Sequence, residues 1–256
     1  MSREPAPPSE VVAQGLTYRY VKTMKRDFFS ENWLIEREGR LYVLKNSRFR
    51  HLFGFLFEPL SGWISRREFR MYSRAAGIRG IPSLHGMVGD NGYIHEYIPG
   101  RNLRQHQYEV GKYTLPDTFF DELLEIVRQV HARGVAHNDM AKKGNIIVGD
   151  DGHPYLLDFH VSVGVVTEPL WARRLTTAIY RRLRQADLYH LLKFKEKYRP
   201  DLVTEDERLA LDRKTPGARL YRIFLQRPYQ FVKRLVYPKG SNETFRFSSG
   251  LKKIRD

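Results

Sequence analysis

The stretch 131–160 constrains the fold more than any other part of the sequence. Its pattern predicts the end of a helix, a loop, and two short apolar strands at 146–148 and 155–157, joined by a turn at 149–152. In such a hairpin, the start of the first strand and the end of the second lie at the same end. We therefore expect the polar residues placed there to lie close together. These residues are Asp139, Asn145 and Asp158.

The side chains expected at this end of the hairpin have the chemistry of a phosphoryl-transfer site. Carboxylate and amide oxygens are the hard ligands that Mg²⁺ prefers, and a carboxylate beside an acceptor hydroxyl can orient it and take its proton. Asp158 ends an apolar strand that would hold its carboxylate rigidly, and Asn145 opens the preceding strand. Asp139 lies in the loop before the hairpin. The three residues are candidate metal ligands or a general base.

The order His137, Asp139, Asn145 and then Asp158-Phe159 resembles the catalytic loop and metal-binding motif of protein-kinase-like phosphotransferases. The sequence is most similar to the small bacterial branch that includes RIO-type kinases and lipopolysaccharide-core (Kdo/heptose) kinases. The resemblance implies ATP and Mg²⁺ as cofactors, with Asp139 as catalytic base and Asn145 and Asp158 as metal ligands. It gives His137 a structural role, bracing the loop through hydrogen bonds.

Two positions depart from the family pattern. The residues 140–144 make the loop after Asp139 one residue longer than in the family, so we expect the loop to bulge. His160 stands where the family usually has glycine. Lys142 is our catalytic candidate for neutralising charge on the transferring phosphoryl group, and Lys143 is its alternative.

Upstream residues agree with the resemblance in type and order. A hairpin turning at Gly39 is expected over 32–45, and Lys45 closes its second apolar strand. By the resemblance, Lys45 contacts the nucleotide phosphates. Glu68, in an expected helix over 65–76, would form the ion pair that positions this lysine.

Four further residues are candidate nucleotide contacts by position. The stretch 25–32 stands where the family has a glycine-rich phosphate loop, yet it contains no glycine, so the Ser30 hydroxyl is the candidate phosphate contact. The stretch 96–98 leads into the linker between lobes, where the family binds adenine through the backbone. Glu96, Tyr97 and Ile98 are our candidates for that contact.

We expect an α+β protein with a bilobal protein-kinase-like fold. Its N-lobe would be a small antiparallel β-sheet with one main helix, and its C-lobe would be reduced and mainly helical. The predicted division is a flexible tail at 1–14, the N-lobe at 15–98, the C-lobe at 99–215 and a basic-aromatic extension at 216–256. A long activation segment is not expected, because no Ala-Pro-Glu motif follows Phe159.

Two helices of the expected C-lobe carry informative residues. One begins near Pro116, with Asp117 as candidate N-cap and apolar residues at helical spacing up to Val130. Another covers 176–197 and is strongly basic. Its Asp187 resembles the buried aspartate that braces the catalytic loop of the family, and a solvent-facing charge is the alternative.

A formal net charge of +15 at pH 7 indicates attraction to an anionic partner, with a solvated basic surface as the alternative. The stretches 46–64 and 216–240 combine aromatic and basic residues. This composition suits peripheral contact with a membrane, and 46–64 could equally be a lid on the N-lobe. Without a nucleic-acid motif, we rank nucleic acid below the membrane. Cysteine is absent from the sequence, which excludes disulfides and fits a cytoplasmic protein, or one peripheral on the inner face of the cytoplasmic membrane.

The expected function is ATP- and Mg²⁺-dependent transfer of the γ-phosphoryl group to a hydroxyl acceptor. An anionic glycolipid, as for lipopolysaccharide-core kinases, is the first candidate acceptor. A protein hydroxyl, as for a RIO-like serine/threonine kinase, is the second. A nucleotide-binding pseudokinase is the rival from another class, favoured by the glycine-free stretch 25–32 and by His160.

Overall fold

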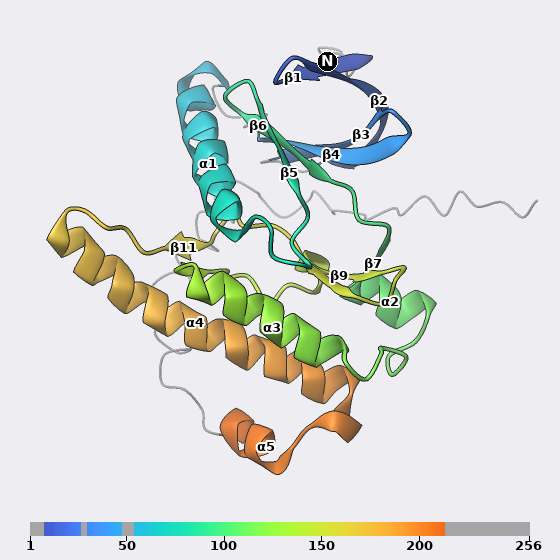
Figure 1. Ribbon diagram of the computed structural model, residues 1–256, viewed down its shortest axis with the longest axis vertical. Coiled ribbons are helices and arrows are strands. Elements are labelled where there is room, and N and C mark those ends of the chain that lie inside the picture. The colour runs from blue at the N-terminus through green and yellow to red at the C-terminus, as the bar shows by residue number, and fades with distance from the viewer. Residues whose placement is uncertain (1–7, 27–29, 48–53, 213–256) are drawn as a thin grey trace, which may run out of the picture. The chain divides into compact units, whose positions relative to one another are not determined.

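The computed structural model of the protein describes residues 8–26, 30–47 and 54–212 (Figure 1). Its largest sheet has six antiparallel strands in the order β1-β2-β3-β4-β6-β5. These strands are β1 (Glu10–Ala13), β2 (Leu16–Arg26), β3 (Ser30–Arg37), β4 (Arg40–Ser47), β5 (Leu84–Val88) and β6 (Gly92–Glu96). Helix α1 (Gly54–Ala75) packs against the sheet, and its side chains are described from Ser61 onward.

The sequence explains the strand pairing locally. Glu38 and Gly39, between β3 and β4, have φ of 53° and 73°. Positive φ at both central residues is the type I′ geometry that suits the twist of a two-residue hairpin, so the predicted turn at Gly39 is confirmed. Alternate strand residues then meet on one face and form a small core. Its members are Val11, Ala13, Tyr18, Trp33, Ile35, Leu44 and Ile94.

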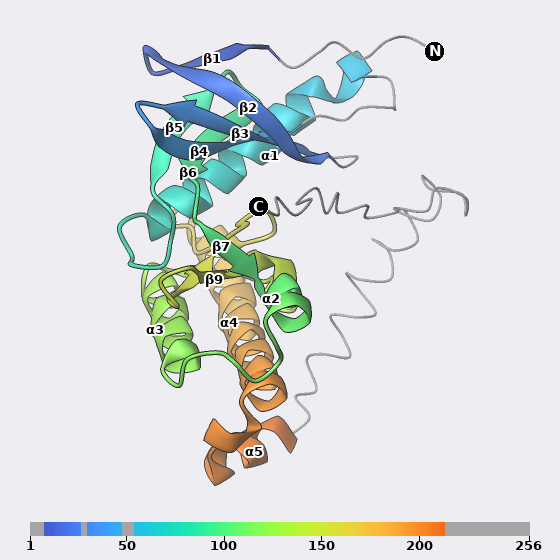
Figure 2. The same cartoon turned by 90° about the vertical axis from the view of Figure 1, so that its right-hand side faces the viewer.

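The remainder of the described chain is mainly helical. It contains α2 (Leu103–Glu109), α3 (Phe119–Ala132), α4 (Leu170–Tyr198) and α5 (Glu205–Asp212), with 3-10 turns at Lys143–Asn145 and Pro200–Leu202. Short strands form two small sheets: β7 (Gly100–Asn102), β9 (Ile146–Gly149) and β10 (Pro154–Leu156) in one, and β8 (Val135–Ala136) with β11 (Val163–Gly164) in the other. Helices α3 and α4 lie side by side (Figure 1, Figure 2).

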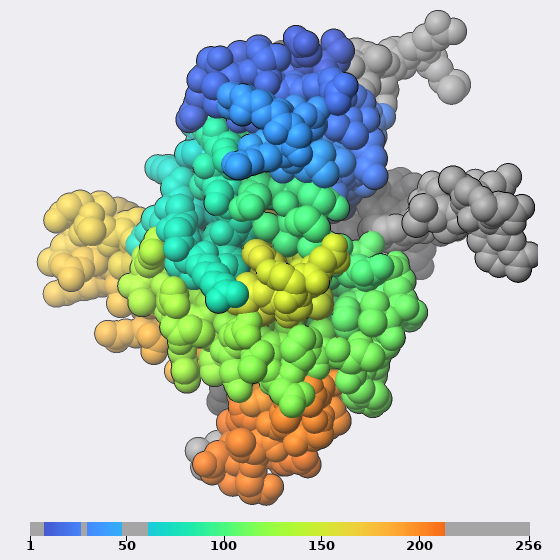
Figure 3. Space-filling view, turned by 45° about the vertical axis from the view of Figure 1, so that its right-hand side comes forward, coloured from blue at the N-terminus to red at the C-terminus, as the bar shows by residue number. Residues whose placement is uncertain are grey.

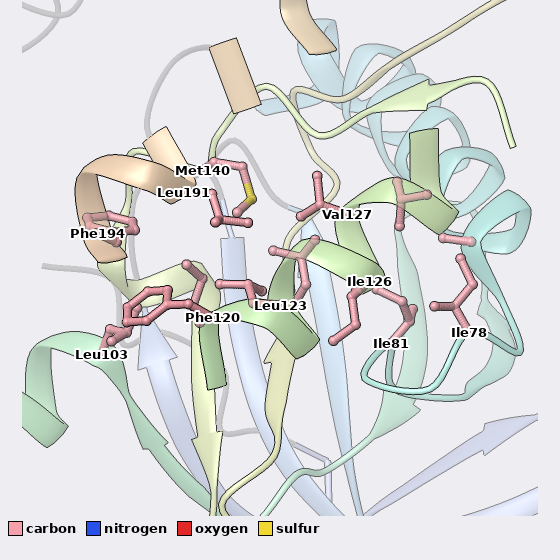
Figure 4. Packing of buried hydrophobic residues seen from close by; sticks show 14 of the residues in the cluster. Ile78, Ile81, Leu103, Phe120, Leu123, Ile126, Val127, Met140, Leu191 and Phe194 are labelled. Atoms are coloured by element: carbon pink, nitrogen blue, oxygen red, sulfur yellow. The ribbon is translucent and has the colours of Figure 1, made fainter. Parts of the chain in front are cut away.

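The main hydrophobic core lies around α3. One face of this helix is buried at helical spacing, through Phe119, Phe120, Leu123, Ile126, Val127 and Val130. Figure 4 shows this face between Leu191 and Phe194 of α4 and the Ile78 and Ile81 side chains that follow α1. The predicted buried helix is therefore confirmed, and its packing supports the β9-β10 hairpin that carries the candidate site.

Helix ends follow local polar contacts, one of which differs from expectation. Helix α3 begins at Phe119 after Thr118, and Asp117 is not its N-cap. The Asp117 carboxylate instead lies 2.7 Å from Arg199 Nη1, so an ion pair outcompetes the cap. At α5, Thr204 and Glu207 exchange the side-chain to backbone bonds of a capping box, at 3.3 and 3.0 Å.

The N-terminal part corrects three expectations. Residues 10–13 of the predicted tail 1–14 form β1, because their backbone pairs with β2. Most of the stretch 25–32 belongs to β2 and β3, and its remaining residues lie outside the described part of the chain. The helix expected over 65–76 instead begins at Gly54.

Two of the buried side chains described near the predicted start of α1 are serines. Ser61 is 2% exposed and Ser65 is 0% exposed. Ser65 Oγ donates to the Asn91 carbonyl at 2.7 Å, which satisfies the buried hydroxyl. The predicted insert 46–64 is divided between two elements, because residues 46–47 belong to β4 and residues 54–64 to α1. The rest of the insert, 48–53, and the predicted extension 216–256 lie outside the described residues. Among the described residues, no helix is both long and apolar enough to cross a bilayer.

Replacing Leu123 with alanine should destabilise the fold strongly. Leu123 is completely buried between α3 and its neighbours, so Leu123→Ala leaves a cavity and should lower the free energy of unfolding by roughly 3 kcal/mol. Leu209→Ala is the control, because Leu209 is 50% exposed on α5. Urea denaturation of both variants would measure the difference, and equal losses would contradict the described core.

Candidate active site

The candidate site centres on the ammonium group of Lys45. This residue lies on β4, and its Nζ is 2.7 Å from Glu68 Oε1 of α1 and 2.8 Å from Asp158 Oδ1. Glu68 is completely buried, and the Tyr93 hydroxyl donates to the same Oε1 at 2.9 Å. The Asp158 side chain keeps 34% exposure. One lysine thus connects the large sheet, α1 and the segment after β10, and leaves Asp158 open to a ligand.

These charges stabilise one another. Burial would by itself lower the pKa of Lys45, but the carboxylates of Asp158 and Glu68 attract its charged form and raise the pKa above its usual value. Burial favours neutral Asp158, yet Lys45 holds the pKa of Asp158 well below the usual range. The same opposition between burial and Lys45 lowers the pKa of Glu68. All three groups are therefore charged at neutral pH.

The loop before β9 places Asp139 beside two of the predicted site residues. Asn145 Nδ2 donates to Asp139 Oδ2 at 3.0 Å and to the Asp139 carbonyl at 3.1 Å. Lys142 Nζ lies 2.5 Å from Asp139 Oδ2, whereas Lys143 Nζ turns away to Gln107 Oε1. Lys142, not Lys143, is therefore the lysine beside Asp139.

The extra residue of the loop is absorbed by two tight turns. Lys142 N–H donates to the Asp139 carbonyl at 3.2 Å, and Asn145 N–H donates to the Lys142 carbonyl at 3.1 Å. Met140 packs fully into the core. The Leu157 N–H then donates to the Asn145 carbonyl at 2.8 Å, so Asn145 lies beside the strand end that carries Asp158. The expected bulge does not prevent the three polar residues from gathering.

A buried carboxylate beneath the loop fixes its backbone. Asp187 of α4 is 1% exposed and accepts the N–H groups of His137 and Asn138, both at 2.8 Å. His131 Nε2 lies 3.0 Å from the same carboxylate. Asn138 has φ of 62°, a conformation that such contacts hold in place. The predicted bracing role of Asp187 is confirmed, and the solvent-facing alternative is wrong.

His137 has the structural position expected of it. Its Nε2–H donates to the Leu157 carbonyl at 2.9 Å, which joins the loop to the residue before Asp158. The Phe159 ring is completely buried against the rings of His137 and Tyr72, with centroid distances of 5.0 Å to each. The segment that carries Asp158 is thereby anchored on both sides.

Two arginines of α1 hold the segment that follows Phe159. Arg67 donates to the carbonyls of His160 and Ser162, at 2.9 and 2.5 Å, and Arg74 donates to the Val165 carbonyl at 3.1 Å. His160 Nδ1 lies 3.5 Å from Glu68 Oε2. The histidine that replaces glycine therefore faces the buried glutamate, a contact that glycine could not make.

The predicted nucleotide contacts lie along the strand ends of the same region. Ser30 opens β3, opposite Ser47 of β4. Glu96 ends β6, its N–H donates to the Ser83 carbonyl at 2.8 Å, and Ile98 lies in the linker before β7. His95 Nδ1–H donates to the Glu96 carbonyl oxygen at 2.8 Å.

The donor set fits a magnesium ion held jointly by protein and nucleotide. Within the described residues, no group of three or more His, Cys, Asp or Glu side chains could hold a metal. Asn145 directs its amide nitrogen to Asp139, which leaves its Oδ1 available, and Asp158 offers an ionised carboxylate. Mg²⁺ is commonly bound through one or two carboxylates plus substrate phosphates, so a sparse protein set of this kind is sufficient.

Comparison with known proteins shows sequence similarity to serine/threonine-protein kinases. No family model matches the sequence. The chain is 27% identical over 171 residues to serine/threonine-protein kinase C of Synechocystis sp., covering 59% of this chain and 31% of that protein. It is 31% identical over 107 residues to a probable serine/threonine-protein kinase of Dictyostelium discoideum, covering 40% of this chain and 8% of that protein.

A solved structure supports the fold. The BubR1 kinase domain matches with a TM-score of 0.51 and 17% identity, covering 76% of this chain and 66% of that chain. The chain belongs to the protein-kinase-like superfamily. The predicted α+β kinase-like fold is therefore confirmed, while the relatives leave open which branch of the superfamily is involved.

Sequence reasoning missed three residues that organise this kinase-like site. Tyr93 shares Glu68 with Lys45, Arg67 holds the segment after Phe159, and His95 donates to the linker carbonyl. Arg67 adjoins Glu68 in sequence, but a basic residue on a basic helix gives no sign of its partner. Tyr93 and His95 lie in an expected strand, where only tertiary packing decides their contacts.

Loss of Asp187 should destabilise the loop and the fold together. Asp187→Ala would leave the buried N–H groups of His137 and Asn138 without an acceptor, so the free energy of unfolding should fall by about 3 kcal/mol. Asp206→Ala, at an exposed position of α5, is the control. Urea denaturation measures both variants, and a loss below about 1 kcal/mol for Asp187→Ala would contradict the bracing role.

His95 should make stability depend on acid. Burial lowers the pKa of His95 to about 4. An unfolded histidine has a pKa of about 6.5, so between these values the unfolded chain binds more protons and stability falls as pH decreases. The variant His95→Asn keeps a donor and cannot titrate. Between about pH 7.5 and pH 4, its free energy of unfolding should therefore fall by roughly 2 to 3 kcal/mol less than that of wild type. The urea midpoints of wild type and His95→Asn, measured across this pH range, test the prediction. The prediction is wrong if the two midpoints change with pH in parallel.

Proposed function

We propose that the protein is a kinase that transfers the γ-phosphoryl group of ATP to a hydroxyl acceptor. The observation that carries the proposal is Lys45 held between Glu68 and Asp158 at the end of the hairpin that also carries Asn145. This combination supports the proposal, because a cation that could bind phosphates lies beside a candidate metal ligand. The kinase names of the sequence relatives agree with it, although the chain spans less than a third of the length of either.

Each site residue has a role in the proposed reaction. Lys45 binds the nucleotide phosphates and is oriented by Glu68. Asp139 orients the acceptor hydroxyl and takes its proton as the oxygen attacks the γ-phosphorus and the ADP oxygen leaves. Lys142, 64% exposed beside Asp139, neutralises charge on the transferring group.

The remaining roles concern ligand positioning. Asn145 and Asp158 would hold Mg²⁺, which when bound neutralises phosphate charge. The Ser30 hydroxyl would contact phosphates, and the backbone of Glu96 and Ile98 would bind adenine. The His95 donor already engages the Glu96 carbonyl, so adenine would share that oxygen or displace the imidazole.

Two acceptor classes are proposed, each with its own support. The names of the sequence relatives support a serine or threonine hydroxyl of a protein, as in RIO-type kinases. The formal charge of +15 supports an anionic membrane-associated sugar, as in lipopolysaccharide-core kinases. Both acceptors present a hydroxyl to Asp139, so the proposed chemistry is the same.

The transfer assay follows label from γ-labelled Mg-ATP into the protein and glycolipid fractions of a bacterial lysate. Wild type should label one fraction, and Asp139→Asn should reduce the rate at least about 100-fold, because asparagine cannot take the proton. Asp150→Asn, an exposed change in the β9-β10 turn, is the matched control and should retain the wild-type rate. The labelled fraction identifies the acceptor class.

Thermal stabilisation by Mg-ATP separates binding from transfer. Wild type should be stabilised, and Asp158→Asn should lose most of this effect because a metal ligand and a partner of Lys45 are removed. Full transfer by Asp139→Asn would refute the role of Asp139. Stabilisation without transfer to either fraction by wild type would replace the kinase proposal with a pseudokinase.

A further inference from the structure

The first turns of α4 expose a row of large apolar side chains. Trp171 is 70% exposed, Leu175 54% and Ile179 41%. Successive members are four residues apart, so they lie along one side of the helix. Large apolar side chains gathered on an exposed helix face indicate a contact surface rather than scattered surface residues.

A different side of α4 attaches these turns to the rest of the protein. The Tyr180 hydroxyl donates to the His131 carbonyl, and the Thr176 hydroxyl accepts the Val166 N–H at 3.3 Å. The beginning of α4 extends past the end of α3 in Figure 1, and Figure 3 shows it projecting from the neighbouring elements. The apolar row is therefore accessible to a partner of large extent.

Arginines border the apolar row. Arg174 follows Trp171 by three residues and Arg182 follows Ile179 by three, so each lies beside the row. Arg181, seven residues after Arg174, is exposed on the same side of the helix as Arg174. Between residues 170 and 186, the sequence has five arginines and no acidic residue. An apolar helical row bordered by cations is the composition of a helix that lies in a membrane interface.

We propose that this face of α4 docks on an anionic membrane surface. The surface consists of Trp171, Leu175 and Ile179 with Arg174, Arg181 and Arg182. The apolar side chains enter the boundary between head groups and acyl chains, while the guanidinium groups pair with lipid phosphates. A second copy of the chain would bring the same arginines face to face, and like charges oppose that occupant.

The docking proposal does not rest on the proposed kinase activity. Vesicle binding is measured without nucleotide or acceptor, so failure of either proposal leaves the other standing. If both hold, docking would concentrate the kinase at a surface that carries lipid-linked acceptors.

The binding test uses the full chain and sedimentation with vesicles. Wild type should bind phosphatidylcholine vesicles that contain about one-third phosphatidylglycerol, and bind pure phosphatidylcholine much more weakly. Two triple variants should each bind the anionic vesicles at least about tenfold more weakly than wild type. The apolar variant combines Trp171→Ala, Leu175→Ala and Ile179→Ala. The arginine variant combines Arg174→Gln, Arg181→Gln and Arg182→Gln.

Matched controls separate this face from net charge and general apolarity. The arginine control changes three exposed arginines outside α4 to glutamine and so removes the same amount of charge. These residues are Arg40, Arg79 and Arg128. Leu209→Ala removes an exposed leucine from α5. Both controls should bind anionic vesicles within about twofold of wild type. Equal loss in the arginine control would reduce the effect to net charge and overturn the proposal.

Tryptophan fluorescence reports insertion directly. In a Trp63→Phe variant, Trp171 is the exposed tryptophan of the described chain, because Trp33 is 6% exposed. Anionic vesicles should shift its emission to the blue and protect it from iodide quenching. The proposal fails if vesicles leave quenching unchanged, if Trp171 is already protected without vesicles, or if the apolar variant merely abolishes self-association.

Discussion

The structure depends on the neutralisation of one buried ammonium group. Lys45 loses solvent on folding, and the carboxylates of Glu68 and Asp158 compensate for that loss. The three charges come from a strand, a helix and the segment after the hairpin, so the ion pairs hold together elements distant in sequence. Removal of either carboxylate would leave part of the charge uncompensated in the interior, which explains why the site and the fold are stabilised by the same contacts.

A second buried charge performs the corresponding task for the loop. Asp187 accepts two backbone N–H groups, including that of Asn138, whose positive φ it helps to maintain. Asp158 also has a positive φ, of 67°. Asn138 adjoins the candidate site and Asp158 belongs to it, so two of the described non-glycine residues with positive φ lie where side chains must be aimed.

Residue type and order predicted much of this arrangement. The resemblance to the kinase family implied the Lys45–Glu68 pair and the bracing role of Asp187, and burial explains why these charges need such partners. The start of α1 at Gly54 was not predicted, and the buried serines Ser61 and Ser65 contribute nothing to a helical hydrophobic period. Contacts of the missed residues depend on tertiary packing that sequence spacing does not contain.

The arginines of α1 have a consequence for communication within the protein. Arg67 and Arg74 donate to backbone carbonyls between residues 160 and 165. These hydrogen bonds link α1 to this segment without involving the candidate nucleotide contacts. A ligand that displaces α1 or the segment 160–165 must either break these hydrogen bonds or move both elements together. By thermodynamic reciprocity, an event at the segment after Asp158 changes the free energy of placing Glu68, and an event at Glu68 changes the segment by the same amount.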